Sequence, residues 1–247
     1  KVKAKITETF GGNLRELIIG GAALNKDVEA FLRRIKFPYT VGYGMTECAP
    51  LIAYAPWQEA RVASCGRVVQ RMEARIDSPD PENIPGVLWV RGDNVMQGYY
   101  KNPEATAAAF TEDGWFRTKD LGCFDKDGWL YIKGRASTTI IGPSGENIYP
   151  VQIEDFLRRH DKISDVAVIG LPDRRLGEVS AAIIQVKEGA TLNEEEVNTF
   201  CLDLPRYKRP RKIIFADVPR NPTGKIEKPK LRKMYSVDGL VAKENEL

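Results

Sequence analysis

The chain has 247 residues, enough for one large domain or two modest ones, and 43% of them are hydrophobic, as in a folded globular protein. Its formal net charge of +3 is too small to indicate nucleic-acid or membrane-surface binding by itself. The four cysteines lie far apart, which argues against a zinc site and favours a reducing, cytoplasmic location. No apolar run approaches the ~20 residues of a membrane-spanning helix. Because the chain opens at Lys1 in strand-like sequence, we expect a fragment whose N-terminal part is missing.

Residues 1–52 predict the end of a parallel α/β domain. Leu14–Ile19 is typical of a short buried strand, and a tight turn follows at Gly20. Asn25 then caps a helix whose apolar positions are Val28, Phe31, Leu32 and Ile35. Phe37–Val41 returns as a strand, which completes the strand-helix-strand unit of a parallel sheet.

Residues 53–136 predict a small, mostly antiparallel β subdomain. A helix interrupts it, with Asn102 as the N-cap and Pro103 at the first helical position. The expected strands are Met72–Ile76, Gly86–Arg91 and Trp129–Lys133.

Residues 137–247 predict a compact α+β domain that follows a short polar hinge. The expected elements are a helix from Pro150, strands near Val166–Ile169, Ala181–Val186 and Ile213–Phe215, and a helix near Glu194–Leu202. The predicted fold class is therefore α/β and α+β, in three parts.

The residues after the second predicted strand suit nucleotide binding. Ligands of open α/β sheets lie at the carboxyl ends of the strands. Tyr43 offers a flat face to a base, Thr46 a hydroxyl to a phosphate, and Glu47 a hard oxygen to Mg²⁺. Taken alone, these residues are more typical of a capped turn with a packed aromatic ring.

Two charged residues stand in distinctive contexts. Asp120 ends the segment Phe116–Asp120, and its carboxylate can accept hydrogen bonds from both hydroxyls of a ribose, with Arg135 as a further donor. Lys225 follows Pro222 and Gly224 on a loop, where an ammonium can neutralise charge as a carboxylate attacks phosphorus. The basic segment Leu204–Pro210 is either a site for an anionic partner or a solvated surface.

Taken together and in chain order, the motifs resemble one family. They are Gly20-Gly21-Ala22, Tyr43-Gly44-Met45-Thr46-Glu47, Gly86–Gly92 leading to Gly98-Tyr99, Phe116–Asp120, Gly134-Arg135, Gly145–Pro150 with Ile153-Glu154, Leu204–Pro210 and Asn221–Lys225. This series resembles the AMP-forming acyl-CoA synthetases of the adenylating superfamily, which includes luciferase and nonribosomal adenylation domains. Within that superfamily, Gly145–Pro150 is most similar to bacterial long-chain fatty-acid–CoA ligases.

The resemblance implies a two-step reaction. A fatty acid or another carboxylate attacks ATP to give an acyl-adenylate and pyrophosphate, and CoA then takes the acyl group and releases AMP. Gly20, Gly21 and Ala22 would line the adenine and acyl pocket. Tyr43 would stack on adenine and Thr46 would touch the phosphate. The remaining roles are Mg²⁺ binding by Glu47, ribose binding by Asp120 and Arg135, and bridging of the carboxylate and the α-phosphate by Lys225.

The resemblance also implies a rotation of the C-terminal domain between the two steps. The hinge position falls on Ser137, and the rotation would bring the loop around Gly145 to the pantetheine tunnel in place of Lys225. The chain departs from the family pattern at Lys119, where Gly is usual, and at Ser137, where a charged residue is usual.

A third departure concerns the Ser/Thr/Gly-rich phosphate loop, which is absent from these 247 residues together with most of the large N-terminal domain. We therefore expect the chain to be inactive alone. The alternatives are an adenylation domain that loads a carrier protein, and a truncated binding module without catalysis.

Overall fold

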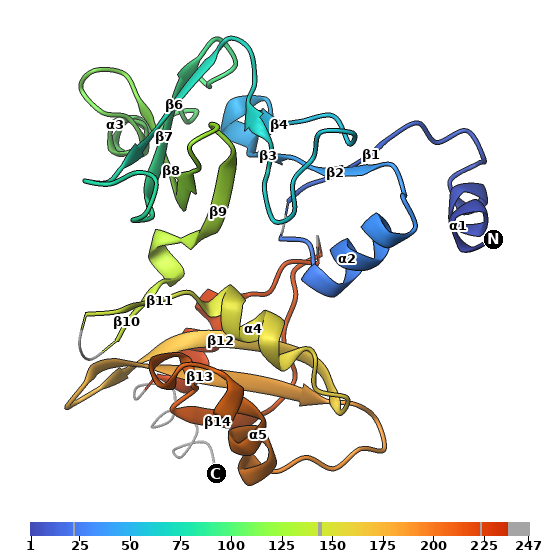
Figure 1. Cartoon of the computed structure of the whole chain (residues 1–247). Coiled ribbons are helices and arrows are strands. Elements are labelled where there is room, and N and C mark those ends of the chain that lie inside the picture. Colours follow the sequence, from blue (N-terminus) through green and yellow to red (C-terminus); the bar gives the residue numbers. More distant parts are fainter. Residues whose placement is uncertain (22, 143–144, 223, 237–247) are drawn as a thin grey trace. The chain divides into compact units, whose positions relative to one another are not determined.

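The computed structural model describes residues 1–21, 23–142, 145–222 and 224–236, and Figure 1 shows their elements in chain order. The chain divides into two compact units, Lys1–Ala136 and Ser137–Leu247. Parallel α/β, antiparallel β and α+β elements are all present, which confirms the predicted mixed fold class. Within the described ranges, no helix combines the length and apolar character that crossing a bilayer requires.

The first unit begins with the predicted strand-helix-strand arrangement. Strands β1 (Leu17–Ile19) and β2 (Tyr39–Val41) pair in parallel, and helix α2 (Lys26–Arg34) connects them. Asn25 caps α2 because its side-chain oxygen accepts hydrogen bonds from two backbone N–H groups of the first turn. The parallel pairing places the carboxyl ends of β1 and β2 at one edge of the sheet.

Two expectations for this region are wrong. Residues near the start form a helix, α1 (Val2–Thr9), rather than a strand. In α2, Val28 is 46% exposed whereas the neighbouring Glu29 is only 2% exposed. The carboxylate of Glu29 is buried because it accepts hydrogen bonds from the hydroxyl of Tyr39 and the backbone N–H of Ala63.

Two antiparallel sheets make up the rest of the first unit. The larger one has the strand order β6 (Met72–Asp77), β7 (Gly86–Gly92), β8 (Phe116–Phe124), β9 (Leu130–Arg135), and helix α3 (Pro103–Ala109) precedes β8. The smaller one contains β3 (Tyr43–Gly44), β4 (Leu51–Tyr54) and β5 (Arg67–Val68), and a 3₁₀ turn, η1 (Thr46–Cys48), separates β3 from β4. Their shared core includes Cys48, Ile52, Leu88, Val90, Phe116 and Leu130.

The second unit is built on a three-stranded sheet. Strand β13 (Gly177–Val186) is central, antiparallel to β12 (Ile163–Asp173) and parallel to β14 (Lys212–Phe215). A short hairpin, β10 (Ile140–Ile141) with β11 (Asn147–Ile148), precedes it, and the 3₁₀ turns η2 (Ala136–Thr138), η3 (Cys201–Asp203) and η4 (Arg206–Lys208) join other elements.

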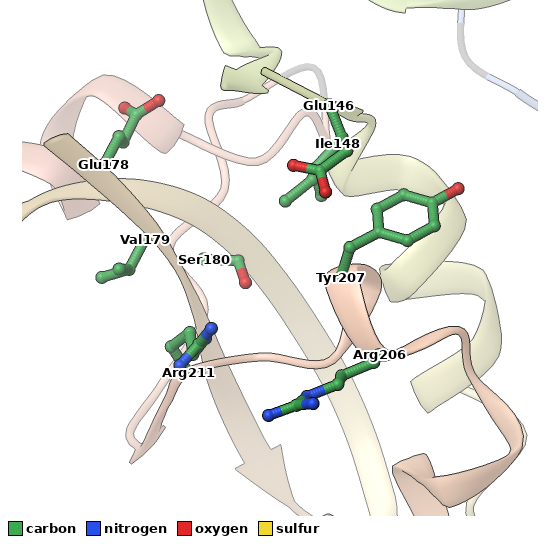
Figure 2. A pocket seen from close by; sticks show the side chains of 8 residues that line it. All are labelled: Glu146, Ile148, Glu178, Val179, Ser180, Arg206, Tyr207 and Arg211. Carbon is green, nitrogen blue, oxygen red and sulfur yellow. The ribbon is translucent and has the colours of Figure 1, made fainter. Parts of the chain in front are cut away.

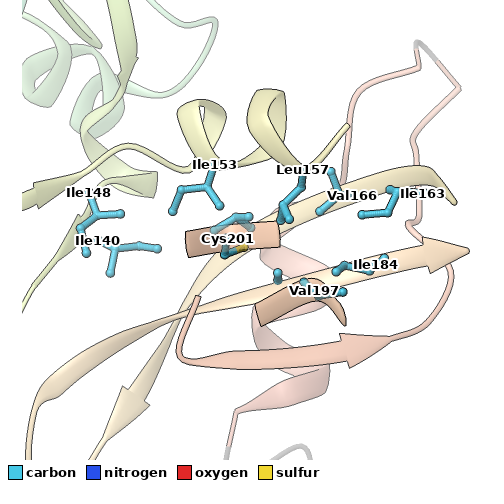
Figure 3. Packing of buried hydrophobic residues seen from close by; sticks show 11 residues of the cluster. Ile140, Ile148, Ile153, Leu157, Ile163, Val166, Ile184, Val197 and Cys201 are labelled. Atoms are coloured by element: carbon cyan, nitrogen blue, oxygen red, sulfur yellow. The ribbon is translucent and has the colours of Figure 1, made fainter. Parts of the chain in front are cut away.

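Helices cover both faces of this sheet. Val166 and Ile184 pack with residues of α4 (Pro150–Leu157) and α5 (Glu194–Phe200), as Figure 3 shows. Residues one position along in each strand, such as Ala167 and Ile183, face the opposite way and pack with Leu231 of α6 (Lys228–Tyr235). The sheet is therefore buried on both sides, and its strands are nearly continuous apolar runs for that reason.

Candidate active site

A buried carboxylate lies at the centre of the candidate site in the first unit. Asp120 is 7% exposed, and it stands opposite Arg135 in the β8–β9 pairing. The Nε–H of Arg135 donates to Asp120 Oδ1 at 2.8 Å, and the hydroxyl of Tyr43 donates to Oδ2 at 2.6 Å. Each carboxylate oxygen can accept more than one hydrogen bond, so acceptor capacity remains for vicinal hydroxyl groups.

The environment of Tyr43 keeps its hydroxyl a donor. Burial, and then the negative charge of Asp120, raise the pKa of Tyr43 well above the ordinary tyrosine value. The charge of the same carboxylate raises the pKa of Arg135. The structure thus brings together three residues that are up to 92 positions apart in sequence.

A bulge in β8 directs Asp120 into this cluster. The β7–β8 register shifts between Val87 and Trp89, so β8 carries extra residues there. The hydroxyl of Thr118 donates to the carbonyl oxygen of Leu88 at 2.8 Å and accepts from the N–H of Asp120 at 3.1 Å. Lys119, between them, is exposed and has a φ of 63°, a conformation that favours glycine.

The turn that carries Thr46 and Glu47 follows Tyr43. Glu47 is held at two points: its carbonyl oxygen accepts from the N–H of Met96 at 2.7 Å, and Oε1 accepts from the hydroxyl of Tyr99 at 3.0 Å. Asn94 fixes the end of the turn by donating to the carbonyl oxygens of Cys48 and Leu51. Thr46 is exposed.

The supporting residues Asn94 and Tyr99 were not identified from sequence. Gly98-Tyr99 was part of the motif series but had no role assigned. The structure shows why glycine is needed at position 98. Its φ is 152°, and a Cβ atom there would lie 2.7 Å from a side-chain carbon of Thr106. Close packing of this loop against α3 is what places the Tyr99 hydroxyl on Glu47.

The donor set around Glu47 fits a magnesium ion that also binds phosphate. Mg²⁺ in nucleotide sites is usually held by one or two carboxylates together with phosphate oxygens. Within the described residues there is no group of three or more potential protein ligands. The carboxylate of Glu47, one oxygen of which accepts a hydrogen bond from Tyr99, could hold such an ion together with phosphate oxygens.

The glycine turn lies beside the start of this site. The N–H of Gly42 donates to the carbonyl oxygen of Ile19, and a Cβ atom on Gly20 would lie 3.4 Å from the Gly42 carbonyl oxygen. Gly21 has a φ of 86°. Gly20 is therefore close to the residue that precedes Tyr43, whereas Gly21 faces open space and Ala22 lies outside the described residues.

The other predicted site residues, Ser137, Gly145 and Lys225, belong to the second unit. Lys225 is exposed on a tight loop, in which its N–H donates to Asn221 Oδ1 at 2.8 Å and its carbonyl oxygen accepts from the Asn221 N–H at 2.9 Å. Gly145 has a φ of 85° in the turn between β10 and β11. Ser137 is the first residue of the unit, and its carbonyl oxygen accepts from Arg232 of α6 at 3.2 Å.

Comparison with known proteins identifies the class. The family model of the AMP-binding enzymes matches residues 1–100, and the model of the AMP-binding enzyme C-terminal domain matches residues 152–225. These two matches together cover well over half of the chain. The chain belongs to the AMP-binding enzyme family.

Curated relatives lie at similar levels of identity. The putative acyl-CoA synthetase YngI of Bacillus subtilis is 38% identical over 232 residues, which are 89% of this chain and 42% of the relative. The 4-coumarate–CoA ligase-like 4 of Oryza sativa is 39% identical over 236 residues (90% and 42%). The long-chain-fatty-acid–CoA ligase FadD13 of Mycobacterium tuberculosis is 37% identical over 239 residues (94% and 47%). The chain thus spans less than half of the length of these relatives.

Solved structures agree on the fold. ATP-bound MatB from Rhodopseudomonas palustris superposes with a TM-score of 0.84 at 32% identity, over 95% of this chain and 48% of that one. The o-succinylbenzoate CoA synthetase of Bacillus subtilis, in complex with its acyl-adenylate intermediate, gives a TM-score of 0.82 at 28% identity, over 93% and 49%.

Proposed function

We propose that this chain is part of an AMP-forming acyl-CoA ligase. Its first unit would bind the nucleotide, and its second unit would be the domain that rotates between the two half-reactions. The buried Asp120 carboxylate, oriented by Arg135 and Tyr43, is the observation that carries the proposal. Charge-assisted hydrogen bonds from two vicinal hydroxyls would satisfy its remaining acceptor capacity. Asp120 and Arg135 would hold the ribose of ATP and of AMP, and the ring of Tyr43 would contact adenine.

The first half-reaction requires neutralisation of charge at the α-phosphate. Glu47 would hold Mg²⁺, as is consistent with the complex of a related o-succinylbenzoate CoA synthetase with ATP and a magnesium ion. When bound, this ion would screen the phosphate oxygens. Thr46, exposed on the same turn, would donate to a phosphate oxygen, and Lys225 would place its ammonium between the carboxylate substrate and the α-phosphate.

The second half-reaction uses the second unit differently. Rotation about Ser137 would withdraw Lys225 and bring the turn at Gly145 to the reacting thiol. Gly145 suits this position because its left-handed φ of 85° carries no side-chain penalty and leaves the backbone open to a ligand. The proposed thiol is that of CoA, and the alternative is the thiol of a carrier protein. Measuring acyl transfer to each acceptor by the complete ligase would distinguish the two.

A ribose-specific binding experiment tests the nucleotide site. We expect Asp120→Asn to weaken AMP binding by roughly tenfold or more, because hydrogen bonds to an ionised group are lost. Asp113→Asn, at an exposed carboxylate of the same unit, is the matched control and should leave the affinity unchanged. Wild-type protein should bind 2′,3′-dideoxy-AMP weakly, and Asp120→Asn should add little to that loss. Equal losses for AMP and 2′,3′-dideoxy-AMP in the variant would exclude ribose binding by Asp120.

The proposed carboxylate substrate is a fatty acid, on the similarity of Gly145–Pro150 to long-chain ligases. The FadD13 ligase and the 4-coumarate ligases resemble this chain to similar degrees, so the assay must include both classes. Thioester formation by the complete ligase should be fastest with a fatty acid. A clear preference for 4-coumarate would contradict the fatty-acid assignment and leave the ligase assignment in place.

We further propose that these 247 residues alone do not form the adenylate. No Ser/Thr/Gly-rich phosphate loop lies among them, and stabilisation of phosphate charge is usually the largest catalytic contribution. Pyrophosphate exchange into ATP with fatty acids should therefore be at background level for this chain. Exchange well above a no-acid control would refute this proposal.

A further inference from the structure

The loop that carries Lys225 is a small hairpin, here called the Lys225 hairpin, that runs from Pro219 to Glu227. At its base, the N–H of Glu227 donates to the carbonyl oxygen of Pro219 at 2.9 Å, and Arg220 pairs with Ile226 in an antiparallel bridge. These bonds, and those between Asn221 and Lys225, lie within the hairpin. They fix its shape, but its orientation on the rest of the unit must come from other contacts.

The side chain of Arg220 connects the hairpin to the sheet. Its Nε–H donates to Asp165 Oδ2 of β12 at 2.8 Å, and a terminal nitrogen lies 2.7 Å from the same oxygen. The other terminal nitrogen donates to the carbonyl oxygen of Gly224 at 2.5 Å. Arg220 therefore joins Asp165 to the residue immediately before Lys225, through hydrogen bonds that its charge strengthens.

A bulge in β12 brings Asp165 to the face of the sheet on which the hairpin packs. The β12–β13 register shifts between Ile163 and Asp165. After the shift, Asp165 shares a face with Ala167, because alternate residues of a strand point the same way. The apolar cluster of Ala167 also includes Val218, just before the hairpin, and Ile226 within it. The base of the hairpin is thus packed on the same face as the carboxylate.

Asp165 is held in place before it meets Arg220. Its side chain is 18% exposed. Oδ1 accepts from the N–H of Val166 at 2.8 Å and lies 3.8 Å from Nε of Arg158, so Oδ2 is left to Arg220. An isolated surface ion pair has little effect on stability, but a partly buried carboxylate between two arginines forms a network with a defined geometry.

The ammonium group of Lys225 is unpartnered by comparison. Lys225 is exposed, and its side chain forms no hydrogen bond or ion pair with any residue that the structure describes. Stabilising charge in a transition state requires placement to within about 0.5 Å, and a displacement of about 1 Å can lower a rate by roughly 100-fold. The position of the Lys225 backbone therefore matters as much as its charge.

We propose that Arg220, fixed by Asp165, is a positioning residue for Lys225 in the first half-reaction. Arg220 contacts neither substrate; it orients the Lys225 hairpin so that the ammonium reaches the α-phosphate. This inference rests on the role proposed for Lys225. Because the second half-reaction does not use Lys225, loss of Arg220 should leave thioester formation largely intact.

The cavity of the second unit does not take part in this arrangement. Its volume is about 380 Å³, and the eight residues that line it, labelled in Figure 2, include neither Arg220 nor Asp165. Substitutions at these two positions therefore leave the cavity lining unchanged. A loss confined to adenylate formation can then be attributed to the hairpin.

Assays of the separate half-reactions with the complete ligase test the proposal. Arg220→Gln should lower kcat of pyrophosphate exchange by roughly 10–100-fold and leave the KM for ATP unchanged, because the hairpin is misplaced while the nucleotide site stays intact. Asp165→Asn should act similarly, and the double variant should lose no more than the larger single loss, because the two residues act as one unit. Arg174→Gln, at an exposed arginine in the turn between β12 and β13, is the matched control and should keep the wild-type rate.

Single-turnover thioester formation from supplied acyl-adenylate shows whether the variants are folded. Retention of this step by Arg220→Gln, with loss of exchange, supports the proposal. Equal losses in both steps would indicate a general structural defect and overturn it, as would a wild-type exchange rate. Lys225→Ala in the same assays separates the two proposals. If Lys225→Ala loses exchange and Arg220→Gln does not, only the positioning role is wrong; if both keep exchange, the role of Lys225 is wrong and the positioning role with it.

Discussion

Lys119 has a backbone conformation that is unfavourable for a residue with a side chain. Its φ of 63° is in the left-handed region, which costs an L-residue roughly 1–2 kcal/mol. Its side chain is exposed and forms no hydrogen bond or ion pair with any of the residues that the structure describes. The conformation is nevertheless required, because the bulge at this position turns Asp120 toward Tyr43 and Arg135. This explains in physical terms why glycine suits the position.

Replacing this lysine should therefore stabilise the protein. We expect Lys119→Gly to raise the free energy of unfolding by about 1 kcal/mol, measured by urea denaturation. The control is Lys133→Gly in β9, where glycine brings no relief and should destabilise by about 0.5–1 kcal/mol. Similar losses in both variants would show that the backbone at Lys119 is not strained.

The hydroxyl of Tyr43 should make stability depend on pH in the alkaline range. Its pKa is raised in the folded state, so its contribution is complete below the unfolded value near pH 10 and is lost as pH rises toward the folded pKa. Tyr43→Phe should cost about 1–3 kcal/mol at pH 7 through the lost bond to Asp120.

Above pH ~10 the difference between wild type and Tyr43→Phe should shrink by up to about 1.4 kcal/mol per pH unit. Unfolding free energies between pH 8 and 11.5 measure it. Other tyrosines contribute equally to both proteins and cancel. A difference that stays constant across the range would refute the raised pKa.

At the scale of elements, an ion pair with little exposure joins three parts of the second unit. Lys228 at the start of α6 lies 2.6 Å from Glu154 of α4, and their side chains are 15% and 4% exposed. The same Glu154 oxygen accepts from the N–H of Val168 in β12 at 2.7 Å. The pair therefore links α6, α4 and the sheet.

Replacing Lys228 alone should lower the free energy of unfolding by more than replacing both Lys228 and Glu154. We expect Lys228→Met to destabilise by about 3–5 kcal/mol, because it leaves a buried carboxylate without its counter-ion. The double variant Glu154→Leu with Lys228→Met should recover much of that loss. A double-mutant cycle of unfolding free energies measures the coupling, and additive losses would exclude it.

The elements predicted from sequence were those with local signals. Asn25 and Asn102 mark helix starts through hydrogen bonds within one turn, Pro103 marks the first helical position, and the nearly continuous apolar runs of the second unit mark its strands. The burial of Glu29 was missed because a distant partner, Ala63, determines it. The helix α1 was missed because it has neither a capping side chain nor a buried residue to mark it. The start of α6 was interpreted as part of a basic tail because its charged side chains obscure the single buried Leu231.

Motif order predicts that Tyr43, Asp120 and Arg135 belong to one site, and their hydrogen bonds to one another are consistent with that prediction. Motif order does not predict the geometry of these contacts. Their contact depends on the bulge in β8, a strand that was not recognised because four consecutive polar residues, 117–120, interrupt its apolar residues. The role of Tyr99 on Glu47 depends on the packing of a loop, which leaves no periodic pattern in the sequence.

For the whole molecule, the proposed two-step reaction predicts a separation of half-reactions. Lys225→Ala in the complete ligase should abolish adenylate formation and largely spare thioester formation from supplied acyl-adenylate, because the ammonium acts only while phosphate charge develops. Lys230→Ala, an exposed lysine nearby on α6, is the control. Pyrophosphate exchange and single-turnover thioester formation measure the two steps, and equal loss of both would contradict the role of Lys225.

The three buried clusters have a consequence for proteolysis. The cluster around Leu88 and Leu130 lies entirely within residues 1–136, and the two clusters on either side of the β12–β13–β14 sheet lie entirely within residues 137–247. Arg135, Ala136 and Ser137 are all exposed, so a protease can reach the chain at this boundary. A cut there would divide the chain without separating the members of any cluster, so two protease-resistant pieces should persist under native conditions.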